Sequence, residues 1–293
     1  MQGNWTNATL TPLERSVEFG QKLTLTDAEA AAYEKQRIAA GNMDRRDGGA
    51  EADVARAYND VFYDRGTQLE RVDGYKRSSL IVDPPDGRIP PFTPEAKKRI
   101  EQARAESRRH PADRPQDLSP QERCIFSARA GPPMLAAMYN NNYQIVQTPA
   151  YVMIFVEEIH DIRIIPLDVR PHLPSNIRKW VGDSIGHWEG DALVVDTTNF
   201  TSKTRFRGTG ENLHVIERFT RISPDTILYR FTIDDPSTFT KAWTAESTFV
   251  AISDKLYEYS CHEGNYAMVD VLRGARLEEK AAEEAAKKGS SER

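Results

Sequence analysis

The feature that most constrains this fold is a succession of short β-type runs between residues 131 and 264, joined mostly by tight turns. Within several runs apolar side chains alternate with polar ones, as in a strand with one buried face. A meander of about nine such strands tends to close into a barrel, because closure leaves no unpaired edge. We therefore predict a mainly β (α+β) protein built on an antiparallel, lipocalin-like β-barrel. The runs are 143–147, 151–158, 162–167, 185–189, 192–198, 213–222, 226–233, 239–252 and 256–261.

Helical signals flank this segment. Thr26 and Glu29 form a capping box that predicts a helix ending near residue 39. Thr93 and Ser119 each precede a proline, which favours a helix start at both places. We also expect a helix over 51–60, a strand over 77–82, a surface loop over 105–115 and a helix over 268–288. The chain is expected to form one unit, with 1–130 as an extension packing on the barrel, 131–264 as the barrel and 265–293 as a C-terminal helix.

The charge of the chain is unevenly placed. The 293 residues carry a formal net charge of −5, and all of the excess acid falls within 131–264. A mild acidic balance argues against a nucleic-acid partner, which would need a strongly basic surface. The longest apolar run, 151–156, is too short to span a membrane. The first residues lack the pattern of a signal peptide, so the protein is either cytosolic or begins after a removed signal.

Motifs for cofactors are absent from the sequence. There is no glycine-rich dinucleotide fingerprint and no P-loop, so no nucleotide cofactor is predicted. The six histidines show no HxH or HxxxH spacing, and we predict no metal, although a site assembled across strands stays open. A nucleophile elbow is also lacking. The chemistry predicted for this chain therefore rests on its acid and base side chains.

Ionisable residues recur inside otherwise apolar strands and at strand ends. An eight- or nine-stranded barrel can hold one small ligand, and paired ionisable groups within it would have shifted pKa values that suit proton transfer. The alternative is that these residues lie on the outer face of the barrel and meet solvent. The candidate carboxylates are Glu157, Asp196, Glu217 and Glu258, and the candidate proton carriers are His160, His214 and His262.

Polar and aromatic residues near these groups could orient a substrate. Arg218 and Tyr139 would position it or stabilise an oxyanion. Side-chain amides in the Asn run 140–142 could orient a carbonyl or hydroxyl group, although such a run is also an ordinary turn. The stretch 168–172, Asp-Val-Arg-Pro-His, is either a ligand clamp or an Asp–Arg pair that fixes a loop. The candidate substrate-binding residues are Tyr139, Asn141, Tyr143, Arg218 and Tyr229.

Several long strings in the chain are specific enough to suggest a family. They are GNWT at 3–6, SLIVDPPDGRIP at 79–90, WEGDALVVDTTNF at 188–200, ERFT at 217–220 and YEYSCHEGNY at 257–266. The chain resembles a large, mostly uncharacterised bacterial family that is usually made with an export signal, over most of its length. The resemblance implies a periplasmic or secreted protein and favours a disulfide between Cys124 and Cys261. On spacing alone, those two cysteines could equally be buried free thiols.

The first functional prediction is a cofactor-independent acid/base enzyme, a lyase, dehydratase, isomerase or cyclase, acting on a hydrophobic or phenolic small molecule. Two alternatives stay open: a non-catalytic periplasmic carrier of an apolar ligand, and a hydrolase of an ester, glycoside or epoxide. The expected partner is a hydrophobic small molecule, with no nucleic acid and no membrane span, and a homodimer is left open.

Overall fold

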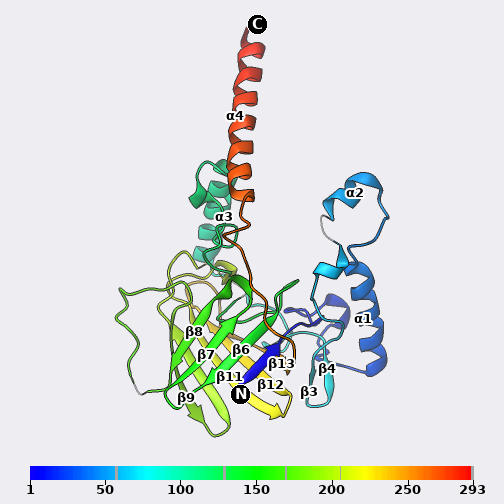
Figure 1. The fold of residues 1–293 in the computed structure, drawn as a ribbon, viewed down its shortest axis with the longest axis vertical. Coiled ribbons are helices and arrows are strands. Elements are labelled where there is room, and N and C mark those ends of the chain that lie inside the picture. Colours follow the sequence, from blue (N-terminus) through cyan, green and yellow to red (C-terminus); the bar gives the residue numbers. More distant parts are fainter. Residues whose placement is uncertain (57–58, 128–129, 169, 205, 292–293) are drawn as a thin grey trace.

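The computed structural model describes residues 1–56, 59–127, 130–168, 170–204 and 206–291, and its centre is one antiparallel sheet (Figure 1). Nine strands follow in the order β8-β7-β6-β1-β13-β12-β11-β10-β9, with β5 added beside β13. The two end strands, β8 and β9, lie against each other, so the sheet curls into a nearly closed barrel. The predicted fold class, an antiparallel barrel with N-terminal helices and a C-terminal helix, is confirmed.

The strands of the barrel are β1 (Gly3–Thr6), β5 (Ile81–Asp83), β6 (Asn142–Gln147), β7 (Tyr151–Val156), β8 (Ile162–Pro166), β9 (Asp183–Glu189), β10 (Ala192–Thr198), β11 (His214–Ser223), β12 (Thr226–Asp234) and β13 (Trp243–Ala251). A smaller sheet contains β2 (Thr24–Leu25), β3 (Arg71–Val72) and β4 (Tyr75–Arg77). The α-helices are α1 (Asp27–Gly41), α2 (Gly49–Ala55), α3 (Pro94–Arg109) and α4 (Ala267–Ser291). Short 3-10 turns are η1 (Val17–Phe19), η2 (Asp60–Phe62), η3 (Pro115–Asp117), η4 (Glu158–His160) and η5 (Phe206–Gly208).

The last predicted strand, 256–261, does not form. After β13 the chain runs on without strand pairing, because the place beside β13 is taken by β1, where Trp5 lies opposite Ala251. The same strand pairs on its other side with β6, where Trp5 lies opposite Tyr143. The barrel therefore takes β1 and β5 from outside the segment 131–264.

The N-terminal predictions are partly correct. The Thr26–Glu29 capping box opens α1, and Thr93 caps α3. The predicted loop over 105–115 is wrong at its start, since α3 continues to Arg109 through Ala, Glu and Arg residues that favour helix. Ser119 accepts a hydrogen bond from the Glu122 backbone, as a cap would, but only a turn follows. Strand 77–82 is divided between β4 and β5, and the helix predicted over 51–60 ends at residue 55.

The barrel interior is filled with apolar side chains, among them a group of aromatic ones from β11, β12 and β13. Phe219 and Tyr229 have ring centroids 4.9 Å apart, and Tyr229 and Phe249 are 5.4 Å apart. Tight packing also closes the barrel between β8 and β9, where a Cβ atom on Gly186 would lie 2.8 Å from Cγ2 of Ile165. The end strands can approach this closely because Gly186 has no side chain.

Helix α4 projects beyond the rest of the protein, above the barrel and alongside the region of α3 (Figure 1). Arg276 joins it to the body by donating to the backbone oxygen of Asp113, at 2.8 Å. Leu277 is 62% exposed on the same helix. Among the described residues, no helix combines the length and apolar character needed to cross a membrane.

Candidate functional site

The candidate site residues fall into four separate places: the barrel interior, the outer face of the barrel, the chain that follows β13, and the loop before β6. The interior holds Glu217 of β11 and Tyr229 of β12, both completely buried. Glu217 accepts two hydrogen bonds from Arg163 of β8, at 3.0 and 2.5 Å, and one from the Tyr229 hydroxyl at 2.8 Å. Glu217 and Tyr229 are among the residues predicted from the sequence, whereas Arg163 is not, although its shared face with Ile165 is a signal for it.

Tyr143 of β6 also points inward and is 2% exposed. Its hydroxyl oxygen accepts a hydrogen bond from Asn7 at 3.3 Å. Burial raises the pKa values of Tyr143 and Tyr229 well above that of a free phenol. Each of these interior groups therefore bonds to a buried partner, and both phenols stay neutral at ordinary pH.

Three pockets open on the outer surface, with volumes of about 810, 590 and 700 Å³. None of these three is lined by Glu217, Tyr229 or Tyr143. Together with the aromatic filling of the barrel, this makes the Arg163–Glu217–Tyr229 network a part of the core. A substrate that diffuses in from solvent must reach the catalytic groups. The candidate residues that solvent reaches lie outside the barrel interior.

The outer face of the barrel brings together two histidines and one carboxylate. Oδ1 of Asp196 lies 2.8 Å from Nε2 of His172, and Oδ2 lies 2.8 Å from Nε2 of His214. Asp196 is in β10, His214 begins β11, and His172 comes from the loop between β8 and β9. The side chains are 24%, 34% and 32% exposed for His172, Asp196 and His214, so the cluster is within reach of solvent.

A second carboxylate holds His172 from the other side. Nδ1 of His172 lies 3.3 Å from Asp183, whose carboxylate also accepts from Arg170, from Lys179 at 2.9 Å and from the Leu173 backbone at 3.0 Å. Burial opposes ionisation of Asp183, but these hydrogen bonds outweigh it and hold the pKa of that carboxyl far below its usual range.

The predicted Asp168–Arg170 side-chain pair is replaced by this arrangement. The Arg170 guanidinium bonds to Asp183, while only the Arg170 backbone contacts Asp168, at its carbonyl oxygen. Residue 169 of that motif lies outside the described residues. The loop is thus fixed to β9, and this fixes His172 at the end of the same motif.

The electrostatics of the outer-face cluster favour a charged histidine. The hydrogen bond to Asp196 raises the pKa of His214 above its ordinary value, against the opposing effect of burial. Asp234, opposite His214 on β12, adds to this increase through its charge. Burial would raise the pKa of Asp196, but the hydrogen bonds from His214 and His172 outweigh it, and that pKa is lowered. The cluster can therefore store a proton on His214 beside an ionised Asp196.

Arg218 shares the outer face of β11 with His214 but does not join the cluster. Its guanidinium donates to Glu189 at the end of β9, at 2.7 Å. Glu189 also lies 3.0 Å from His187. The predicted role of Arg218 beside the carboxylates is therefore not supported by its position.

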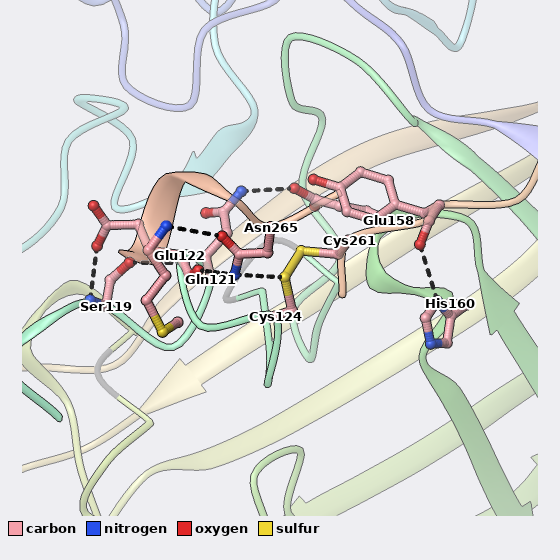
Figure 2. The surroundings of a disulfide bond; sticks show 10 residues. Ser119, Gln121, Glu122, Cys124, Glu158, His160, Cys261 and Asn265 are labelled. Atoms are coloured by element: carbon pink, nitrogen blue, oxygen red, sulfur yellow. Dashed lines mark hydrogen bonds between the residues drawn. A yellow bond between two sulfur atoms is a disulfide. The ribbon is translucent and has the colours of Figure 1, made fainter. Parts of the chain in front are cut away.

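Four further candidates lie in or near the segment after β13, and Figure 2 shows one of them, His160, beside that segment. Glu157 is buried and accepts hydrogen bonds from Asn142 at 2.8 Å and from the Tyr257 backbone at 2.9 Å. His160 is exposed, with Nδ1 3.2 Å from the Tyr259 carbonyl oxygen. Both residues thus fasten the segment to the end of β7.

The disulfide favoured by the resemblance is confirmed: Cys124 and Cys261 are bonded, with Cα atoms 5.7 Å apart. Glu258 lines the 590 Å³ pocket beside it, and His262 is exposed on the turn that follows. Asn265 donates to the Glu122 backbone at 2.9 Å and ties the start of α4 to the same loop (Figure 2).

The amides and phenols at 139–143 are predicted from the sequence to bind substrate. In the structure, Asn141 of this stretch holds the loop in place by hydrogen bonds to the backbone. Asn141 is buried, accepts from the Ala137 backbone at 2.6 Å and donates to the backbone oxygen of Asp64. Tyr139 beside it is half-buried. The structure therefore supports the turn interpretation of this Asn run. Within the described ranges, no three His, Cys, Asp or Glu residues are placed to hold a metal ion.

Comparison with known proteins adds little. No family model matches the chain, and no curated protein matches it. Among solved structures, the chain is similar to a mutant of the fluorescent protein UnaG, with 13% identity and a TM-score of 0.26. That alignment covers 39% of this chain and 72% of that one. With a similarity this low, the fold assignment rests on the strand order.

Proposed function

We propose that the protein is an acid–base enzyme whose site is the outer-face cluster of His172, Asp196 and His214. The observation that carries the proposal is the pair of 2.8 Å contacts by which one carboxylate holds two partly exposed imidazoles. An imidazole held by a carboxylate is suited to moving a proton near neutral pH. The reaction class that needs only this is elimination or isomerisation of a small molecule.

Within the cluster, His214 is the proton carrier. Its Nε2 is bound to Asp196, and its Nδ1 has no hydrogen-bond partner among the residues the structure describes. Neutral His214 takes the substrate proton on Nδ1, and the ionised Asp196 stabilises the imidazolium that forms. The proton returns to another substrate atom or to the leaving group. His172 is a positioning residue, because both of its ring nitrogens face carboxylates.

The test is proton exchange into candidate substrates in D2O, followed by proton NMR, on a panel of phenolic and aryl-ketone compounds. We expect His214→Gln to lose at least about a hundredfold of any exchange rate found with the wild type. Rates should rise with pH through the pKa of His214, which lies above its ordinary 6.5. Arg218→Gln is the control, since Arg218 is on the same strand face but bound to Glu189. An unchanged rate in His214→Gln would refute the assignment.

We also propose that the protein works in an oxidising compartment, the periplasm or the outside of the cell. The support is the Cys124–Cys261 disulfide, since such bonds persist mainly outside the reducing cytosol. Thiols are titrated on unfolded, unreduced protein from periplasmic and from cytosolic expression. We expect no free thiol in the periplasmic sample, and two thiols there would contradict the proposal.

A further inference from the structure

An apolar groove lies between α3 and the chain that leads into it, away from the histidine cluster. From α3 it is lined by Ile100, Ala103, Arg104 and Ser107, which share one helical face at spacings of three and four. The opposite wall is the stretch 89–92, Ile-Pro-Pro-Phe, and η5 closes one side with Arg207 and Gly208. The groove has a volume of about 700 Å³, which is the size of a small-molecule site.

The walls of this groove are held in place before any ligand arrives. Phe92 stacks on Phe239 with ring centroids 5.5 Å apart, and the Pro91 carbonyl accepts from the Thr240 backbone at 2.9 Å. Arg99 of α3 donates to the Gly208 carbonyl at 3.1 Å, joining the helix to η5. Gly208 comes so close to the helix that a Cβ there would lie 2.6 Å from Cδ1 of Ile100. A site fixed in this way loses little conformational entropy on binding.

Two arginine side chains border the apolar surface of the groove and bond to none of the described residues. Arg104 and Arg207 are both exposed, and neither makes a hydrogen bond or ion pair with any residue in the described ranges. The one acidic residue of the lining, Glu14, accepts the backbone hydrogen bond of Ile89 at 3.0 Å. The groove thus offers an apolar floor, and its lining carries two guanidinium charges and one carboxylate charge, which leaves it net positive.

We propose that this groove binds a single-chain amphiphile that carries a carboxylate, with its apolar chain against Phe92 and Ile100 and its carboxylate between Arg104 and Arg207. Guanidinium groups bind carboxylates by paired hydrogen bonds, and the apolar floor removes the chain from water. The site is separate from the proposed acid–base cluster, so either assignment can fail without the other.

Isothermal titration of the full chain tests the proposal with decanoate, 1-decanol and decyltrimethylammonium, below their micelle concentrations. Decanoate is expected to bind at one site, about tenfold more tightly than decanol, and the cation should bind most weakly. In the double variant Arg104→Gln/Arg207→Gln, decanoate affinity should fall about tenfold, to that of decanol. Arg108→Gln removes an α3 charge outside the groove and should leave the affinity unchanged.

A second variant tests the location. Ser107 is exposed at the groove wall, so Ser107→Trp should fold normally, checked by circular dichroism, and abolish binding of decanoate and decanol alike. His214→Gln should keep the wild-type decanoate affinity, which separates this site from the proposed catalytic one. Equal affinity of decanoate and decanol, unchanged binding in Ser107→Trp or in the double arginine variant, or no binding at all would overturn the proposal.

Discussion

At the scale of residues, strand alternation showed which side chains share a face, but neither which face points inward nor which residues make contact. Glu217 shares a face with Val215 and Phe219, and the structure shows that this face is the buried one. Asp196 and His214 could be assigned as candidates, but not as a pair with His172. That histidine comes from a loop 24 residues before Asp196, and a period-two pattern carries no information about the path of a loop.

The first prediction concerns Asp196→Asn. His214 has a raised pKa in the folded protein, so its stabilising contribution is complete below about pH 6.5 and is lost as the pH rises through the folded value. Asp196 has a lowered pKa, so its contribution is present above about pH 3.8 and is lost as the pH falls through the folded value. The variant should therefore lose most stability between about pH 4 and 6.5. Solvent screening of this partly exposed pair limits the loss to about 1 kcal/mol.

Two measurements check this prediction. Denaturant unfolding across the pH range gives the stability difference, and NMR titration of the ring protons should show a lower His214 pKa in the variant. Asp234→Asn serves as the control, because Asp234 acts on His214 only through its charge and should lower that pKa less. A His214 pKa that does not move in Asp196→Asn would contradict the hydrogen bond.

The second prediction concerns the buried ion pair of Arg163 and Glu217, whose side chains are 2% and 0% exposed. Glu217→Gln leaves the guanidinium without its charge partner in the core and should cost about 3–5 kcal/mol of unfolding free energy. The double variant Arg163→Met/Glu217→Leu removes both charges and should be more stable than Glu217→Gln. Urea unfolding measures both, and a double variant that is the less stable of the two would show that the pair itself is net stabilising.

At the scale of elements, the sequence predicted the strands that pair with a neighbour close by in the chain. The hairpin β9–β10 and the hairpin β11–β12 each lie within a few residues of their turn, and the prediction placed their strands within one or two residues. The strand predicted over 256–261 has a strand-like composition, but its place in the sheet is occupied. Strand β1 went unpredicted because it has four residues and pairs with partners far along the chain.

The third prediction concerns the segment between β13 and α4. Cys124 and Cys261 are 137 residues apart, so their disulfide restricts the unfolded chain strongly. The double variant Cys124→Ser/Cys261→Ser should lose about 2–4 kcal/mol. The segment should also loosen locally, with faster hydrogen exchange at the Tyr257 amide that now bonds to Glu157. Unchanged exchange at that amide would show that Glu157 and Asn265 hold the segment without the disulfide.

At the scale of the whole molecule, the barrel depends on close contact between its two end strands. The fourth prediction is that Gly186→Val forces β8 and β9 apart, since its Cβ would meet Ile165 at 2.8 Å. We expect a loss of about 1–3 kcal/mol, measured by thermal and urea unfolding. Gly210→Ala is the matched control, because a Cβ at Gly210 meets nothing within 4 Å. A Gly186→Val protein as stable as the wild type would mean that the barrel tolerates a gap there.

Strand β1 gives the molecule a particular order of assembly. Trp5 lies between Tyr143 and Ala251, so β1 is seated between two strands that come much later in the chain. Before β13 is available, β1 can pair with β6 alone, and its other edge has no partner strand. The barrel therefore cannot be completed until β13 is available to pair, and contacts this distant in sequence fold slowly. Until then the chain has open strand edges, the state in which β proteins are most exposed to aggregation and depend most on chaperones.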